Sequence, residues 1–157
     1  MLTILNWQDS MWQSELHSIF NLKLHLSKKQ NRLTIREYDI YKLIEPVEFL
    51  NLAWSKEKLK HRAPHVIEMT HRFNILSNWA AVSIVTTESL KERKAKFAKA
   101  VNLAKECFKL NNFNSMKAIL GGLENAAVHR LRFTKDDLVA AVTNELTQMI
   151  NVTSQER

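Results

Sequence analysis

Histidine, cysteine and closely spaced carboxylates are the side chains that most often carry chemistry, and this sequence brings few of them together. Its histidines are His17, His25, His61, His65, His71 and His129. A zinc site needs two or three such residues on one helical face, with a carboxylate or cysteine nearby. His61 and His65 have the spacing of one helical turn, but Pro64 between them breaks a helix. We therefore predict no metal site and no cofactor.

The elements of nucleophilic catalysis and of nucleotide binding are also missing. Cys107 is the only cysteine and has no base near it in the sequence, so we expect it to be a small core residue. Gly121 and Gly122 are the only glycines, and they cannot form a P-loop or a dinucleotide-binding loop. A glycine pair is instead typical of a place where two helices, or a helix and a partner, approach closely. We predict no catalytic residue.

Composition points to a helical protein. Only two glycines and two prolines occur in 157 residues, and such a shortage of turn residues argues against an all-β fold. The single cysteine excludes an internal disulfide, and no stretch approaches the roughly 18 apolar residues of a membrane span. We therefore expect a cytoplasmic protein without an integral membrane segment.

The net charge of +7 allows for an acidic partner. Nucleic acid, acidic lipid and acidic proteins all attract a basic surface. The most basic run is Lys91–Lys96, which has no interleaved aromatic residues on which bases could stack. We interpret this run as a solvated helix face and predict no nucleic-acid partner.

Apolar residues recur every three or four positions along almost the whole chain, which predicts an all-α fold. We expect a first helix within residues 1–25 and a polar connector at Leu26–Asn31. Thr34 is expected to cap the next helix, because Glu37 stands three residues later and completes a capping box. The apolar face of that helix would be Ile35, Ile40, Leu43 and Ile44.

Prolines and small polar residues mark the later helix boundaries. Pro46 should end the second helix and begin a short one, and Pro64 should begin a long one. Thr87 is expected to cap the following helix, Asn111 and Asn112 to interrupt it, and Thr134 to cap a last one. The predicted core contains Phe73, Trp79, Phe113, Leu120 and Leu123.

Three segments carry further information. They are LTIREYDIYKLIEPVEFL (33–50) followed by AWSK (53–56); APHVIEMTHRFNILSNW (63–79); and LNNFN (110–114), continuing through AILGGL (118–123) to VHRL (128–131). In sequence, order and spacing they resemble the Ras guanine-nucleotide exchange family, in the catalytic region called the Cdc25-homology domain. The resemblance implies a single irregular helical domain that forms the N-terminal part of the catalytic fold. We place it at 26–134, between an N-terminal helix (1–25) and a C-terminal helix with a frayed tail (135–157).

The resemblance also implies a partner and a site. The partner is a Ras-like small GTPase, whose nucleotide such proteins release without covalent chemistry. In the family, the second and third motifs form a bowl that receives the GTPase segment called switch II. The corresponding positions here are Thr70, His71, Lys117, Gly121, Glu124, Asn125 and His129. Lys117 stands where an apolar residue is usual, and Glu124 where asparagine is usual. We expect His71, Lys117, Glu124 and His129 to share one concave face.

Two parts of the family pattern have no counterpart in this sequence. After the third motif the family continues into a protruding pair of helices that opens switch I, and Phe133–Arg157 is too short to supply it. Met1–Lys29 is too short for the bracing domain that usually precedes the catalytic one. We therefore expect weak or no exchange by this chain alone, and recruitment to the inner membrane surface only through its GTPase. Two alternatives stay open: a non-catalytic module that binds a GTPase or another protein, and one half of a split exchange factor whose second polypeptide supplies the pair.

Overall fold

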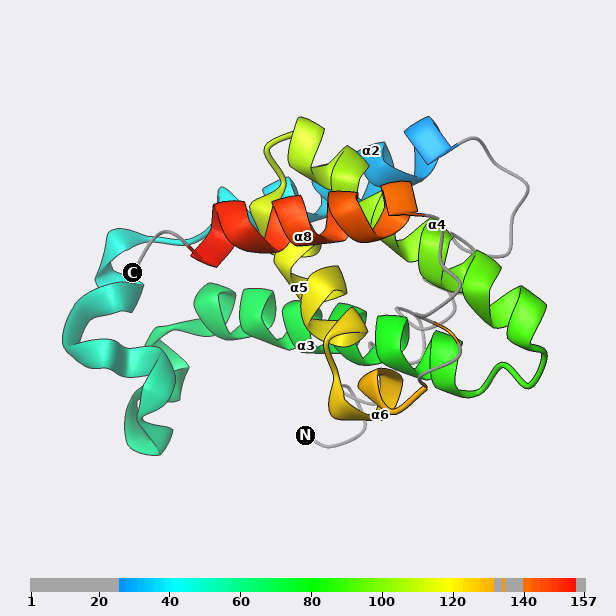
Figure 1. The fold of residues 1–157 in the computed structure, drawn as a ribbon. Coiled ribbons are helices and arrows are strands. Elements are labelled where there is room, and N and C mark those ends of the chain that lie inside the picture. The colour runs from blue at the N-terminus through cyan, green and yellow to red at the C-terminus, as the bar shows by residue number, and fades with distance from the viewer. Residues whose placement is uncertain (1–25, 132–133, 135–139, 155–157) are drawn as a thin grey trace.

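A computed structural model describes residues 26–131, 134 and 140–154 of the chain (Figure 1). Within these residues all regular structure is helical, which confirms the predicted all-α fold. The α-helices are α2 (Leu26–Tyr41), α3 (Pro64–Val85), α4 (Leu90–Lys109), α5 (Phe113–Leu123), α6 (Ala126–His129) and α8 (Ala140–Ser154), and the 3-10 segments are η1 (Pro46–Ser55) and η2 (Glu57–Arg62). The predictions for residues 1–25, 132–133, 135–139 and 155–157 lie outside the described residues.

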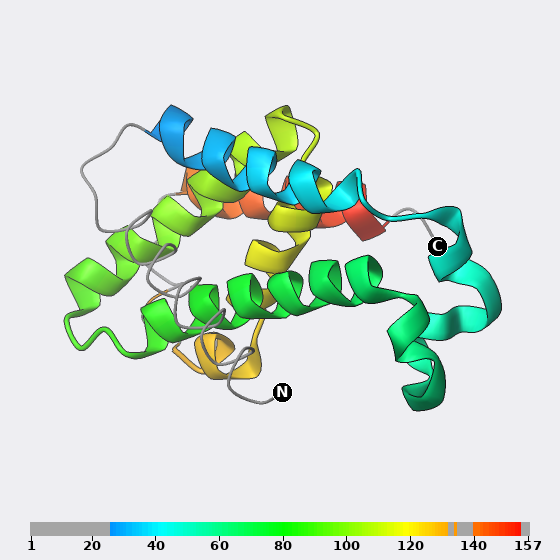
Figure 2. The ribbon, with the colours of Figure 1, turned by 180° about the vertical axis from the view of Figure 1, so that it is seen from behind.

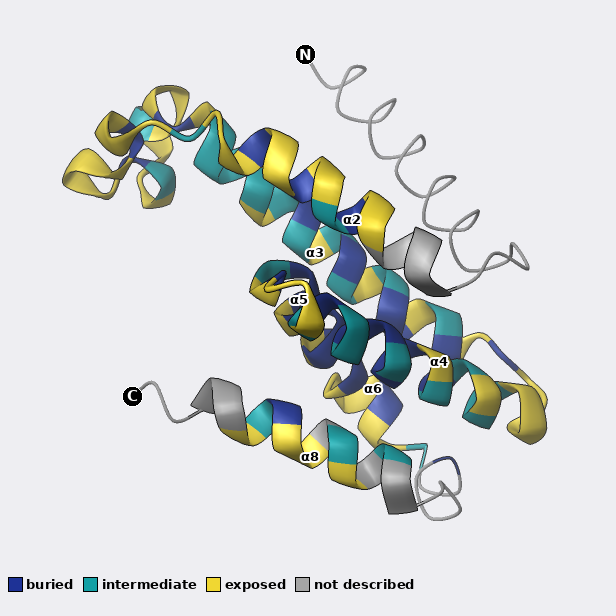
Figure 3. Cartoon of the chain, turned by 90° about the horizontal axis from the view of Figure 1, so that it is seen from above, coloured by how far each residue is buried: buried dark blue, intermediate teal, exposed yellow. Residues whose placement is uncertain are grey.

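Helix α5 is the centre of the fold. It crosses α3 (Figure 2) and lies against α4, and those two contacts are the most extensive between elements of the described chain. Seen from above, α2 and α8 lie on opposite sides of α5 (Figure 3). Phe97 of α4 and Met116, Ile119 and Leu123 of α5 are fully buried. α5 is thus held by packing on most of its circumference.

Four of the five predicted core residues lie in the core or pack against it. Leu120 and Leu123 are buried, and Phe73 and Trp79 are half-buried against the same core. The prediction is wrong for Phe113, whose side chain is 49% exposed. Phe113 is the first residue of α5, so its ring lies at the edge of the core, edge-on to Phe108 with the ring centroids 5.9 Å apart.

Helix α2 begins earlier than expected. It starts at Leu26, so the predicted connector is helical, and Thr34 lies inside the helix instead of capping it. Lysine and glutamine, which fill positions 28–30, are good helix formers and need no burial. The side chains of Thr34 and Glu37 instead accept hydrogen bonds from the start of α5. Asn112 Nδ2 donates to Thr34 Oγ1 (3.1 Å), and Asn114 Nδ2 donates to Glu37 Oε1 (3.0 Å).

The inward face of α2 also differs from the prediction. Ile40 is buried as expected, but Ile35 and Leu43 are exposed. The buried positions are Leu33, Glu37 and Ile40, which follow the helical steps of four and three. The inward stripe of α2 therefore includes a carboxylate that the apolar pattern did not identify.

Most of the later boundaries are confirmed. Pro46 begins η1, Pro64 begins α3, and Asn112 caps α5 by accepting a hydrogen bond from the Ser115 amide (3.0 Å). The cap of α4 is Ser89 and not Thr87, because the Thr87 hydroxyl donates to the Ser83 carbonyl (2.8 Å) at the end of α3. Cys107 is buried, as predicted.

The last described helix, α8, packs against α4. Met149 is buried in the common core, and Lys105 of α4 forms an ion pair with Glu145. None of the helices described is long and apolar enough to cross a membrane.

Candidate functional site

The exposed side of α5 is a narrow stripe. From Ser115 to Leu123 every residue except Lys117 and Gly121 is buried, and the exposed Glu124 follows as the C-cap. Lys117, Gly121 and Glu124 are spaced by four and three residues, so they lie on one face of the helix. We call these three residues the α5 stripe. Three of the seven predicted site residues therefore lie together on the one face of this helix that packing leaves open.

Gly122 sets the distance between α5 and α3. A Cβ atom added to it would lie 2.4 Å from the Ser77 carbonyl oxygen and 2.8 Å from the Ala80 Cβ, so only glycine fits there. A Cβ on Gly121 would lie 3.5 Å from the Ser77 Oγ, which is ordinary contact. The close approach predicted for the glycine pair is therefore made by Gly122. It brings the α5 stripe beside the Ser77 face of α3.

Thr70 and His71 lie on α3, before this crossing. Thr70 is exposed, and its hydroxyl donates to the Val66 carbonyl (2.8 Å), while His71 is half-buried. Thr70 precedes Ser77 by seven residues, so it lies on the same face of α3, two turns from the crossing. Thr70 and His71 thus lie along the helix that α5 crosses.

Asn125 and His129 bound α6, which contacts both α3 and α5. Asn125 is the N-cap of this short helix, with its Oδ1 accepting from the Ala127 amide (2.9 Å), and His129 is its exposed last residue. All seven predicted residues therefore lie on three helices that contact one another. That His71, Lys117, Glu124 and His129 share one concave face stays a prediction.

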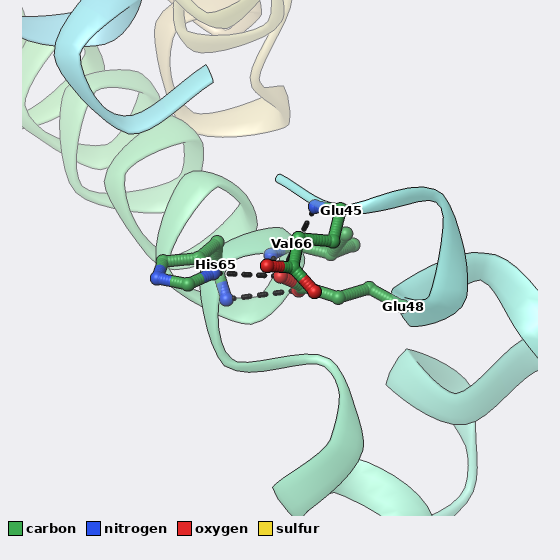
Figure 4. Close-up of polar contacts among 4 residues, drawn as sticks. All are labelled: Glu45, Glu48, His65 and Val66. Carbon is green, nitrogen blue, oxygen red and sulfur yellow. Dashed lines mark hydrogen bonds and ion pairs between the residues drawn. The ribbon is translucent and has the colours of Figure 1, made fainter. Parts of the chain in front are cut away.

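A buried carboxylate fixes the N-terminus of α3 (Figure 4). Ala63, the N-cap of α3, has no side chain that can accept a hydrogen bond. Glu48 of η1 supplies one instead: its Oε2 accepts from the His65 and Val66 amides, both at 3.0 Å, and its Oε1 lies 2.6 Å from His65 Nδ1. Burial of Glu48, which is 3% exposed, raises the pKa of its carboxyl, but the bonds from Val66 and His65 outweigh that effect and leave the pKa below its usual value. Sequence reasoning missed this contact, which anchors the helix that carries Thr70 and His71.

Comparison with known proteins identifies the family. Residues 31–157 match the RasGEF domain. The chain belongs to the RasGEF domain family. It is 44% identical over 108 residues to Ras guanine nucleotide exchange factor J of Dictyostelium discoideum, 41% identical over 130 residues to factor I, and 38% identical over 125 residues to factor A of the same organism. These alignments cover 68%, 82% and 80% of this chain, but only 13%, 15% and 21% of those relatives.

Two groups of residues bear on the chemistry of this RasGEF-domain chain: the metal-ligating side chains and the single cysteine. Among the residues that the structure describes, no three histidine, cysteine or carboxylate side chains are grouped as a metal site would need. Burial raises the pKa of the Cys107 thiol to about 12, with the charges of Glu37 and Glu106 adding to that effect, so the thiol carries no reactive thiolate at neutral pH. The RasGEF-domain chain also presents a face of mixed charge on α5, formed by Lys117 and Glu124.

Proposed function

We propose that this chain binds a Ras-like small GTPase and acts on the exchange of its guanine nucleotide, with the α5 stripe, Thr70, His71, Asn125 and His129 facing switch II. The observation that carries the proposal is the α5 stripe. From Ser115 onward this helix exposes Lys117 and Gly121, with Glu124 as the exposed C-cap, and the family resemblance assigns these positions to GTPase binding. Exposed polar residues on a helix whose other sides are packed are well placed for recognition, because the backbone that carries them is already ordered before binding.

Exchange requires differential binding. A protein speeds nucleotide release only if it binds the nucleotide-free GTPase more tightly than the nucleotide-bound one. A surface that contacts switch II alone binds both forms with similar affinity, since it does not disturb the site of the phosphates and Mg²⁺. We therefore expect residues 1–157, tested as they stand, to bind a GTPase and to accelerate nucleotide release only slightly.

The proposal is tested by a charge exchange on the α5 stripe. The double variant Lys117→Glu/Glu124→Lys keeps the net charge of the chain but reverses the pattern along α5. A matched control, Lys99→Glu/Glu88→Lys, makes the same exchange at exposed positions on and just before α4. Each protein is titrated, by biolayer interferometry, against immobilised Ras-like GTPases in nucleotide-free form and in complex with GDP.

We expect the α5 variant to lose at least about tenfold in affinity, because reversed charges oppose one another across an interface, and the control to bind like the wild type. If both variants bind equally well, attraction by net charge explains the binding and the α5 stripe does not contact the GTPase. If no GTPase binds the wild type, the proposed function is wrong.

Exchange itself is measured in parallel, as release of a fluorescent guanine nucleotide from the same GTPases. Release that becomes fast only when a separate fragment carrying the C-terminal part of a relative's RasGEF domain is added would favour the split exchange factor. Binding without acceleration under either condition would favour the non-catalytic module.

A further inference from the structure

A cavity of about 460 Å³ opens between α2 and the N-terminus of α5. Its lining comes from α2, from the turn after α4, from the first residues of α5 and from Met69 of α3, and includes none of the seven predicted GTPase-binding residues. The volume lies within the range of about 300–1,000 Å³ that is typical of ligand pockets. The cavity is therefore large enough for a side chain or a small organic molecule, and it is separate from the residues assigned to the GTPase.

The walls of this cavity are rich in exposed aromatic rings. Tyr38 and Tyr41 of α2 are 62% and 64% exposed, and Phe113 at the start of α5 is 49% exposed. Aromatic faces attract cations as well as apolar groups. The Lys42 ammonium, which pairs with Asp39 Oδ1 (2.8 Å), also lies 5.9 Å from the centroid of the Tyr38 ring. The walls suit a ligand that combines positive charge with an apolar body.

The cavity also has a carboxylate in its lining that is only partly satisfied. Glu37 is 6% exposed, and its Oε1 accepts a hydrogen bond from Asn114 Nδ2 (3.0 Å). Its Oε2 is buried, and no group among the described residues donates a hydrogen bond to it. A buried carboxylate oxygen without a partner is rare in folded proteins, because its desolvation is not compensated. The negative charge of Glu37 acts on the cavity through surroundings of low dielectric constant, where it attracts a cation more strongly than in water.

We propose that this cavity is a binding site for an arginine side chain presented by a partner polypeptide. A guanidinium group stacks on aromatic rings, and its positive charge is attracted by a carboxylate in the lining, so it matches both the walls and Glu37. The apolar stem of arginine fits beside Leu110 and Met69, which also line the cavity. This site is independent of the α5 stripe, so the chain would hold a second polypeptide without using the residues assigned to the GTPase.

The test uses two probes that differ in charge alone. N-acetyl-arginine methylamide is titrated into the isotope-labelled chain of residues 1–157, and N-acetyl-citrulline methylamide, its neutral isostere, is titrated separately. Binding is followed by the NMR signals of the Asn114 side-chain amide and of the Tyr38 and Phe113 backbone amides. We expect saturable shifts at these three positions with the arginine probe, and an affinity for the citrulline probe that is lower by at least about tenfold, as loss of a charge-assisted contact predicts.

Two variants establish which groups are responsible. Glu37→Gln should abolish the preference for arginine over citrulline, and Tyr41→Ala should weaken both probes by a few-fold without disturbing the fold, since Tyr41 is largely exposed. Phe49→Ala removes an exposed aromatic ring of η1 that does not line the cavity, and it should change nothing. Thermal unfolding of each variant checks that the fold is kept.

Three results would overturn the proposal. Equal binding of the two probes would show an apolar cavity without charge selection. Shifts that spread over surface carboxylates without saturating at Asn114 would show non-specific ion pairing. Arginine selectivity that survives in a folded Glu37→Gln variant, together with unchanged affinity of both probes for Tyr41→Ala, would place the binding elsewhere.

Discussion

Two neighbouring glycines of α5 provide a stringent test of the helix crossing. Replacing either one with alanine adds a single methyl group and gains about 1 kcal/mol, because glycine is a poor helix former. At Gly122 the new Cβ would lie 2.4 Å from the Ser77 carbonyl oxygen, which is backbone and cannot rotate away, so α3 and α5 must separate. Overpacking of a dense core costs about 1–3 kcal/mol, and a clash with backbone belongs at the upper end of that range.

The two variants should therefore differ in sign. We expect Gly122→Ala to lose about 2 kcal/mol of unfolding free energy after the helix-propensity gain is subtracted. Gly121→Ala should gain up to about 1 kcal/mol, since its Cβ meets only the Ser77 Oγ at 3.5 Å. For a domain of this size, each kcal/mol shifts the melting temperature by about 2–4 °C.

Urea unfolding followed by circular dichroism measures both changes, and the melting temperatures provide an independent check. If Gly122→Ala is as stable as Gly121→Ala, α3 and α5 do not meet at Gly122 and the placement of the α5 stripe beside α3 is wrong. If both variants lose stability equally, the cost arises within α5 itself and not from the crossing.

Three further predictions concern the contacts that hold these helices. Glu48→Gln should lose about 1–3 kcal/mol of unfolding free energy at neutral pH, because charge-assisted bonds at the start of α3 are weakened. Since the folded-state pKa of Glu48 is lowered from 4.5, this difference from the wild type should be fully present above pH 4.5 and vanish as the pH falls through the lowered value, which unfolding curves over pH 2–7 would show. Asn114→Ala should cost about 1–3 kcal/mol in the same urea assay, because it leaves both oxygens of the buried Glu37 without a donor. Cys107 should react with a thiol reagent such as Ellman's reagent only in unfolded chains, so labelling that is equally fast in native buffer and in urea would contradict its burial.

Local signals in the sequence were enough for several features of the fold. Pro46 and Pro64 mark helix starts because their fixed φ angle and missing amide suit the first turn. Asn112 caps α5 through its own side chain. The glycine pair was recognisable as a close-approach position because a glycine within a helix otherwise costs stability, but only the structure shows that Gly122 makes the contact. Each of these signals depends on one residue and its immediate neighbours.

The features that sequence reasoning missed depend on partners far along the chain. The capping-box spacing of Thr34 and Glu37 is genuine, but their side chains bind Asn112 and Asn114, which lie 78 and 77 residues away. Glu48 caps a helix that begins 16 residues after it. The spacing of apolar residues, which reveals buried positions in a sequence, cannot reveal a buried carboxylate. One clue was available: a 22-residue helix that begins Ala63-Pro64 has no side-chain cap of its own, so its amides need an acceptor from elsewhere.

The two departures from the family pattern have a different meaning in the structure than in the sequence. A lysine and a glutamate inside a binding bowl suggest buried charges, which need partners. Lys117 and Glu124 are exposed at the two ends of the α5 stripe, so neither costs the folded chain any desolvation. The cost arises only when a partner covers them, and it is offset if that partner brings an acceptor to Lys117 and a donor to Glu124. If the proposed function holds, we expect these two residues to affect the choice of GTPase and to leave the stability of the fold unchanged, because they lie on the side of α5 opposite to its buried face.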